Sequence, residues 1–284
     1  MRVSVYIPTR NRVAKLAESV LSVLAQSHVD LEIIVVDDAS EDATPELLAD
    51  LQRSDSRLRH IRFEERRGPS AARNAAIAEA RGEFVTGLDD DDLMLPNRVA
   101  TLLQSFNPQY AFTCSSIVLQ KSDGRRKILH GKPGIITLDQ LLYYNAVGNQ
   151  VFTLTHRIRE IGGFDEDMAG FEDYDLWIRL TKRFGPASRI SAATYIKREH
   201  DRSAQLTWAD SFVEGARRFR YKHNSLLNPA QRHSQLMLER LSASQSLSLV
   251  DLCRAIRYPS FHTFVRYAVN HAWKILRRAP EKTS

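Results

Sequence analysis

Two apolar runs in the first hundred residues constrain the fold more than any other feature. Residues 31–36 (LEIIVV) are nearly continuous in apolar side chains and end in Asp37-Asp38. Such a run, without regular polar alternation, is typical of a strand buried on both faces of a parallel sheet. Residues 83–88 repeat the pattern and lead into four aspartates at 89–92. The sequence therefore predicts a parallel sheet with two acidic clusters at the carboxyl ends of its strands.

Segments with helical spacing alternate with these strands. A β-branched strand over residues 3–7 is expected to end at Pro8, and a third strand covers 58–63. An alanine-rich helix ends near Gly82. The alternation of strand and helix predicts a doubly wound α/β layer. The expected helix starts are Asn11, Asp42 and Ser70, with Asn11 and Ser70 as N-caps.

The second half of the chain is less regular. Residues 110–120 are expected to form another strand, and residues 121–132 a polar loop that turns at Gly124. From residue 211 onward the pattern is helical, with breaks at Pro229 and Pro259. Length alone favours about two domains. We expect a main domain over 1–205, with halves over about 1–105 and about 106–205, and a helical extension over 206–284.

The charge is distributed unevenly. Residues 206–284 hold 13 Lys and Arg against 5 Asp and Glu, although the whole chain has a net charge of only +6. Within this basic extension, residues 261–278 form an amphipathic pattern with aromatic residues on the apolar face. Such a helix suits either an anionic membrane surface or packing on protein, and both interpretations stay open. No recognised nucleic-acid-binding module is visible, so nucleic acid is not an expected partner.

The sequence predicts a cytoplasmic protein, with peripheral attachment to the inner face of the plasma membrane as a further possibility. The N-terminal apolar stretch is short and ends at Pro8, unlike a signal peptide. No apolar run reaches the ~18 residues that a membrane span needs. Cys114 and Cys253 are expected to be free thiols rather than a disulfide framework.

The four consecutive aspartates predict a cation site. Adjacent carboxylates repel one another, and a divalent cation is the simplest way to hold them together. In an extended segment, Asp89 and Asp91 would share one face. Their hard oxygen ligands suit Mg²⁺ or Mn²⁺ bridging a diphosphate, and the alternative is an exposed acidic loop. Arg73, in the first turn of a helix, is a weaker sign of an anion site.

A third acidic group interleaves charges with aromatic residues over 170–177 (GFEDYDLW). If a helix starts here, Glu172 and Asp173 lie in its first turn, where the helix dipole favours ionised carboxylates. One of them could act as a general base toward a hydroxyl nucleophile. A charge complement to the helix N-terminus explains this stretch equally well.

The motifs, taken in order, resemble those of family 2 inverting glycosyltransferases of the GT-A fold. They are IPTRNR, IIVVDDAS, GPSAARNAAIAEARGEFVTGLDDDD, GGFDE and FEDYDLWIRL, and the resemblance covers roughly residues 3–205. It implies a Rossmann-like domain with a mainly parallel central sheet. It also implies that Asp173 is the catalytic base and that Asp89 and Asp91 form the DxD metal motif.

The resemblance assigns further residues by position. Asp90 stands where the family often has a small residue, close to the donor. His200 resembles a later histidine that can approach the metal or the diphosphate. The donor-binding positions are Pro8, Thr9, Asp37, Asp38, Arg73, Asp89 and Asp90, and the acceptor-side positions are Glu172, Trp177 and Arg179.

The implied activity is metal-dependent transfer of a sugar, with inversion, from a nucleotide-diphosphate sugar to a hydroxyl of a glycan or lipid-linked glycan. The family implies synthesis of a bacterial surface polysaccharide such as lipopolysaccharide, capsule or exopolysaccharide. UDP-hexose is the favoured donor and dTDP-rhamnose its rival; an oligomer is possible. A phosphatase or nucleotidyltransferase is disfavoured, because IPTRNR lacks the nucleophile and the glycine-rich loop that those enzymes need. A non-catalytic sugar-nucleotide-binding or membrane-binding module stays as the alternative.

Overall fold

A computed structural model describes residues 1–129, 133–148, 150–168, 170–199 and 206–243, with residues 251, 253, 256 and 258. By its contacts the chain divides into two compact units. Unit 1 contains Met1–Leu138, Val147–Asp167 and Glu172–Asp201, and unit 2 contains the remainder. The amphipathic segment 261–278, Pro259 and His200 lie outside the described residues.

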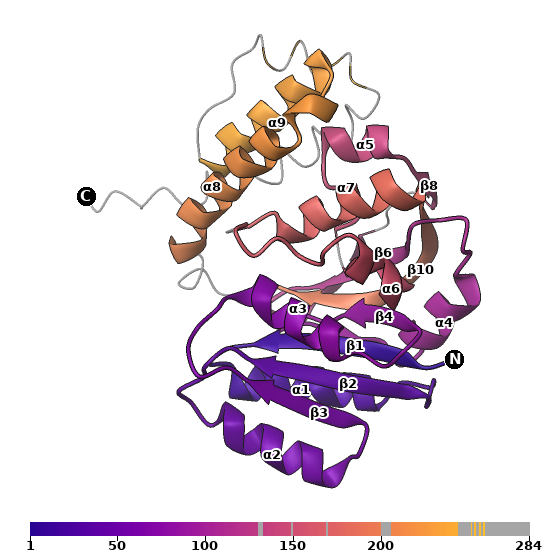
Figure 1. Cartoon of the computed structure of the whole chain (residues 1–284), viewed down its shortest axis with the longest axis vertical. Coiled ribbons are helices and arrows are strands. Elements are labelled where there is room, and N and C mark those ends of the chain that lie inside the picture. The colour runs from indigo at the N-terminus through magenta and orange to yellow at the C-terminus, as the bar shows by residue number, and fades with distance from the viewer. Residues whose placement is uncertain are drawn as a thin grey trace. The chain divides into compact units, whose positions relative to one another are not determined.

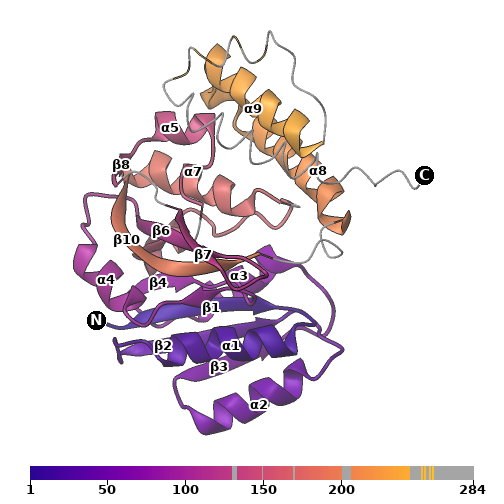
Figure 2. The ribbon, with the colours of Figure 1, turned by 180° about the vertical axis from the view of Figure 1, so that it is seen from behind.

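Unit 1 is built on a central sheet with the strand order β3-β2-β1-β4-β9-β6-β10-β5 (Figures 1 and 2). Its first four strands are parallel, as the alternation of strand and helix predicted. Every residue of β2 is buried, in agreement with a strand covered on both faces. These strands are β3 (Leu58–Arg62), β2 (Leu31–Asp37), β1 (Val3–Thr9) and β4 (Phe84–Gly87).

Beyond β4 the sheet becomes mixed. β9 pairs antiparallel to both β4 and β6, whereas β6 and β10 are parallel to each other. Two short strands, β7 on β6 and β8 on β10, lie off the main path. The strands are β9 (Phe152–Leu154), β6 (Thr113–Gln120), β10 (Ala187–Arg198), β5 (Leu93–Met94), β7 (Arg126–Leu129) and β8 (Gly134–Ile136).

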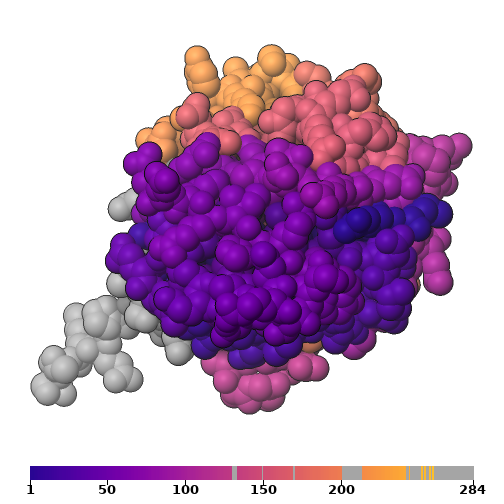
Figure 3. Space-filling view, turned by 60° about the horizontal axis from the view of Figure 1, so that its bottom comes forward, coloured from indigo at the N-terminus to yellow at the C-terminus, as the bar shows by residue number. Residues whose placement is uncertain are grey.

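Helices cover both faces of the parallel strands. α3 lies in front of them in Figure 1 and α1 lies in front in Figure 2. Alternate residues of β1 and β2, such as Val5 and Ile33, pack with Leu16 and Val20 of α1 in the main core. On the side of unit 1 where α2 lies, the surface consists mainly of atoms of the N-terminal elements, coloured indigo and purple (Figure 3). The helices are α1 (Val13–Leu24), α2 (Thr44–Ser54), α3 (Pro69–Glu79), α4 (Arg98–Ser105), α6 (Thr155–Glu160) and α7 (Glu172–Phe184).

The described part of unit 2 is helical. It contains α8 (Leu206–Lys222), η2 (Asn224–Leu226) and α9 (Pro229–Ser242), together with most of α5 (Leu138–Tyr143). Tyr143 packs with Met237, Leu238 and Tyr258 in a small apolar core. Ser234 of α9 donates a hydrogen bond to the carbonyl of Tyr143 at 2.7 Å, which fixes α9 on α5. None of the helices in the described residues combines the length and the apolar composition that crossing a bilayer requires.

Three predicted boundaries are wrong. Pro8 lies inside β1, opposite Val36, because β4 stops pairing at Tyr6 and so no neighbour on that side needs the missing N–H. Asn11 does not cap α1, because it adopts φ +53° and accepts from the N–H of Glu41. Ser70 lies inside α3, which starts at Pro69 with Gly68 at the N-cap.

Two segments also differ from the expected pattern. Within the polar stretch 121–132, residues 126–129 form β7, because they pair with β6 across the turn at Gly124. Side-chain polarity did not predict this edge strand, three of whose four residues are exposed. The helix expected from residue 211 begins earlier, at Leu206.

Candidate active site

The residues predicted to bind the nucleotide-sugar donor lie together at the carboxyl ends of β1 and β2. Thr9 lies opposite Asp37 in the register, and the N–H of Asp38 donates to the carbonyl of Thr9 at 2.9 Å. Asp37 is fully buried, and its Oδ1 accepts from the N–H of Ser40 at 3.0 Å. The topology therefore brings Pro8, Thr9, Asp37 and Asp38 to one edge of the sheet, where ligands of open α/β sheets bind.

Asp38 shapes the loop between β3 and α3. Its two carboxylate oxygens accept from the backbone N–H groups of Arg67 at 2.6 Å and Gly68 at 2.9 Å. Gly68 has φ +90°, a conformation that is easy only for glycine. The two hydrogen bonds to Asp38 fix the start of α3 and therefore the position of Arg73, which lies in that helix. A carboxylate has further lone pairs, so Asp38 can still accept from a ligand.

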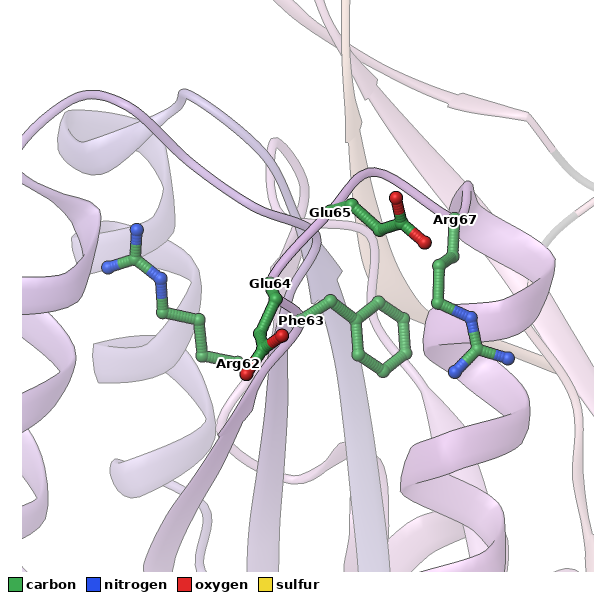
Figure 4. Close-up of a pocket in the computed structure, with 5 residues that line it drawn as sticks. All are labelled: Arg62, Phe63, Glu64, Glu65 and Arg67. Carbon is green, nitrogen blue, oxygen red and sulfur yellow. The ribbon is translucent and has the colours of Figure 1, made fainter.

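A pocket opens beside these residues at the end of β3 (Figure 4). Phe63 forms one wall, and the guanidinium of Arg67 lies 4.7 Å from the centre of its ring. Arg62 donates to the carbonyl of Ser40 at 3.0 Å. The sequence did not predict these residues as part of a site, although an aromatic residue between charged residues directly after a strand could have indicated one. The lining residues are Arg62, Phe63, Glu64, Glu65 and Arg67.

The four aspartates form a turn and not the extended segment that we expected. The N–H of Asp92 donates to the carbonyl of Asp89 at 3.0 Å, which closes the turn. The argument that alternation places Asp89 and Asp91 on one face is therefore wrong. Asp90 accepts from Thr9 at 2.8 Å and from Arg12 at 2.9 Å, and Arg12 also pairs with Asp91.

Burial makes this turn electrostatically costly. It raises the pKa of Asp90 to about 6, and burial together with the charge of Asp89 raises the pKa of Asp92 to about 7. Asp92 is held by the hydroxyl of Tyr195 and the N–H of Arg198, both at 2.8 Å. A cation beside the turn would lower the cost of keeping these carboxylates ionised.

Arg73 joins three parts of the site. Its guanidinium donates to Asp89 at 3.2 Å and to Glu172 at 3.0 Å, and it lies 5.3 Å from the centre of the Phe164 ring. Burial opposes the charge of Arg73, but Asp173 and these two carboxylates outweigh it and hold its pKa well above the usual value. Arg73, which the sequence indicated only weakly as part of an anion site, is therefore a buried guanidinium in contact with acidic residues.

Asp173 has the properties of a general base. It lies in the first turn of α7, which begins at Glu172 as predicted. Its Oδ1 is buried and has no hydrogen-bond partner among the described residues. Burial raises the pKa of Asp173 to about 7, because Arg73 only partly compensates for desolvation and for the negative charge of Glu172. A carboxylate with this pKa can accept a proton near neutral pH.

A divalent cation fits the chemistry of this site only if phosphate and water supply part of its coordination shell. No group of three His, Cys, Asp or Glu side chains that could hold a metal occurs within the described ranges. Asp89 and Asp91 can supply two hard oxygen ligands, and Mg²⁺ often binds through one or two carboxylates and completes its shell with phosphate and water. Arg12 and Arg73 now contact these same carboxylates.

Trp177 and Arg179 lie behind the site. Trp177 is fully buried and contacts the rings of Phe112 and Phe164. Arg179 pairs with Asp175 and donates to the carbonyls of Ile161 and Gly163, so it holds the GGF loop on α7. Any effect of these two residues on an acceptor passes through the elements that they position.

The sequence of this chain is similar to those of known glycosyltransferases. The model described as glycosyl transferase family 2 matches residues 4–165. WcaA of Escherichia coli K12, named as a glycosyl transferase of colanic acid biosynthesis, is 30% identical over 82% of this chain and 85% of that protein. The GalNAc(5)-diNAcBac-PP-undecaprenol beta-1,3-glucosyltransferase of Campylobacter jejuni is 33% identical over 64% of this chain and 60% of that protein.

Solved structures show the same fold at low sequence identity. Residues 1–349 of TarS from S. aureus, in complex with UDP-GlcNAc, align with 100% of this chain and 93% of that one, with 18% identity and a TM-score of 0.62. The mannosyltransferase PcManGT of Pyrobaculum calidifontis, in complex with GDP-Man and Mn²⁺, aligns with 98% of this chain and 88% of that one, with 18% identity and a TM-score of 0.59.

Proposed function

The chain belongs to glycosyl transferase family 2 and has the GT-A fold, and we propose that it transfers a sugar from a nucleotide-diphosphate sugar to a hydroxyl of a glycan or lipid-linked glycan in the synthesis of a bacterial surface polysaccharide. WcaA is named for colanic acid biosynthesis, and the Campylobacter relative for transfer to an undecaprenol-linked glycan. UDP-hexose is the favoured donor, since TarS was solved with UDP-GlcNAc; dTDP-rhamnose is the rival. This setting favours a cytoplasmic enzyme at the inner face of the membrane.

One observation carries the proposal: the buried Oδ1 of Asp173 has no hydrogen-bond partner among the described residues, and Asp173 belongs to the same group of charges as Arg73 and Asp89 of the acidic turn. A base without an internal partner can accept the proton of an acceptor hydroxyl. Glu172 beside it would help to place that acceptor, and Arg73 carries the positive charge that a leaving diphosphate needs. The acceptor then attacks opposite the leaving group, so the anomeric configuration inverts.

We assign the donor to the carboxyl ends of β1, β2 and β3. The base and ribose would lie near Thr9, Asp37 and Asp38, beside the pocket of Figure 4. Asp89 and Asp91 would hold Mn²⁺ or Mg²⁺, and the bound cation would supply charge that stabilises the diphosphate. Residues 1–105 thus serve the donor, residues 106–205 the acceptor, and the extension 206–284 a further role.

Calorimetric titration of UDP and of dTDP, each with and without Mn²⁺, tests the donor class. We expect one nucleotide to bind in a metal-dependent manner, and Asp91→Ala to abolish the effect of the metal. Asp123→Ala is the matched control, because Asp123 lies in the exposed turn between β6 and β7 and pairs only with its neighbour Arg125 in the described structure. Failure of both nucleotides to bind in the presence of Mn²⁺ would overturn the proposed donor class.

The alternative is a module that binds nucleotide sugars without turning them over. Such a module would bind UDP or dTDP in the same titration. It would release no nucleoside diphosphate from any donor when a bacterial lipid-linked glycan fraction is supplied as the acceptor. Asp173→Asn separates the two functions, because it leaves the donor edge intact and removes the base.

A further inference from the structure

A buried pair of side chains behind the acidic turn, Tyr6 and Gln150, has no role in the site described so far. Tyr6 lies on β1, and Gln150 lies just before β9. Only 2% of Tyr6 and 1% of Gln150 are exposed, so neither side chain can contact a donor directly. We propose that Tyr6 and Gln150 are positioning residues that hold the Asp89 carboxylate in the orientation needed for the metal–diphosphate part of the donor; this inference rests on the proposed function.

The contacts form a short chain of hydrogen bonds. The Tyr6 hydroxyl donates to Oε1 of Gln150 at 2.8 Å. Nε2 of Gln150 then donates to Oδ1 of Asp89 at 3.3 Å. The same Oδ1 accepts from Arg73 at 3.2 Å. Two donors from different elements therefore fix one oxygen of Asp89, and none of the described residues donates a hydrogen bond to its other oxygen.

The carboxylate of Asp89 determines which end of the Gln150 amide faces it, because a carboxylate can only accept hydrogen bonds. Burial raises the pKa of the Tyr6 phenol far above its usual value, so the hydroxyl keeps its proton and remains a donor. Nε2 of Gln150 therefore points to Asp89, and Oε1 accepts the hydrogen bond of the Tyr6 hydroxyl. Without that hydroxyl, the buried Oε1 would lose this donor, and the amide would be held less firmly against Asp89.

The backbone around this pair leaves little room for another arrangement. A Cβ added at Gly87 would lie 2.3 Å from the Tyr6 ring and 2.7 Å from Oε1 of Gln150. Arg98, which is fully buried, donates to the carbonyl of Gln150 at 2.8 Å and lies 5.0 Å from the centre of the Tyr195 ring. Tyr195 in turn contacts Asp92 and the N–H of Asp89.

This arrangement costs free energy that a purely structural core would avoid. A buried amide and a buried guanidinium must both find hydrogen-bond partners, and an apolar core of similar volume has no such requirement. In the described structure, Arg98 donates to two hydroxyls and one carbonyl and to no carboxylate. The hydrogen bonds of Tyr6 and Gln150, by contrast, end on Asp89 of the acidic turn, which supports a role in orienting that carboxylate.

The test compares Gln150→Leu and Tyr6→Phe with wild type by calorimetric titration of UDP, or of dTDP if that is the nucleotide that binds, with and without Mn²⁺. We expect Gln150→Leu to reduce the Mn²⁺ enhancement of nucleotide affinity by about 10- to 100-fold, as for other partners of metal-binding side chains. Tyr6→Phe should cause a smaller loss in the same direction. The affinity without Mn²⁺ should stay within about twofold of wild type.

Thr153→Val is the matched control. It removes one buried hydroxyl hydrogen bond, to the carbonyl of Ala111, in the same part of the sheet. This variant should lose thermal stability but keep the Mn²⁺ enhancement. A merely structural role for Gln150 would give the same pattern as Thr153→Val, a lower melting temperature with an unchanged metal effect, and would overturn the inference.

Two further outcomes are decisive. If Gln150→Leu does not fold, Tyr6→Phe carries the test, because it removes a single oxygen; an unchanged metal effect in Tyr6→Phe then overturns the inference. If wild type binds neither nucleotide, or binds it equally well without Mn²⁺, the proposed metal-dependent donor site fails and the positioning role fails with it. Metal-dependent binding that the variants leave unchanged overturns the positioning role alone.

Discussion

At the scale of single residues, Asp173 decides whether the site can react. Replacing Asp173 with Asn keeps the size of the side chain but removes its ability to take a proton. We expect turnover to fall by about 10²- to 10⁴-fold with little change in UDP affinity. Because the pKa of Asp173 is about 7, the wild-type rate should rise with pH through about 7 and then level off. A rate that is independent of pH between 5.5 and 8.5 would contradict the assignment.

The same residue makes a prediction about stability. The folded-state pKa of Asp173 is raised above its unfolded value, so between about pH 4 and 7 the native state binds the proton that the unfolded state releases. The unfolding free energy that Asp173 contributes therefore falls as pH rises. In thermal melts, Asp173→Asn should be more stable relative to wild type at pH 8 than at pH 5. Glu46→Gln, an exposed change on α2, should show no such trend.

Arg12 makes a third prediction at this scale. Its guanidinium pairs with Asp90 and Asp91 and neutralises part of the acidic turn. Arg12→Ala should lower the melting temperature in EDTA. Added Mn²⁺ and UDP should reduce the difference from wild type, because the cation replaces the lost charge. An equal loss of stability in both conditions would show that Arg12 stabilises the fold independently of the metal.

At the scale of elements, the loop before α3 connects Asp38 to Arg73. Asp38 accepts hydrogen bonds from this loop, and the loop fixes the start of the helix that carries Arg73. Gly68 has φ +90° and ψ 166°, a region that is essentially restricted to glycine, and no atom lies within 4 Å of an added Cβ, so Gly68→Ala costs only backbone strain, about 1–3 kcal/mol. Gly124→Ala is a matched control, since Gly124 has φ +80° and the same open space. Both variants should lose stability by denaturant unfolding, and only Gly68→Ala should weaken UDP binding. Equal UDP affinity would show that the loop geometry does not affect the donor site.

At the scale of the whole molecule, the basic extension predicts attachment to anionic surfaces. The excess of Lys and Arg over residues 206–284, with the amphipathic pattern at 261–278, favours binding to anionic vesicles over zwitterionic ones. We expect cosedimentation of the full chain with anionic vesicles, and its reduction in about 0.5 M salt. A chain ending at residue 260 should bind less. Equal binding of both chains would favour a protein-packing role for the segment.

The sequence alone determined the α/β layer and the sites of its acidic residues. The alternation of strands and helices predicted the layer, and the apolar run of β2 predicted a parallel sheet with acidic clusters at the carboxyl ends of its strands, because such a run suits burial on both faces. The acidic first turn of α7 was also visible, since helix starts favour carboxylates. Both patterns involve only neighbouring residues, so they can be recognised in the sequence without knowledge of the fold.

Only the tertiary structure decided how the acidic residues are partnered. Gln150 lies 61 residues from Asp89 in sequence and 144 from Tyr6, and nothing in its local sequence indicates either contact. The turn at 89–92 replaced the expected extended segment because Tyr195, Arg198 and Ser19 hold it from distant elements. Such contacts depend on which distant segments the fold brings together and on which side chains it buries. The periodicity of apolar residues in the sequence carries no information about either.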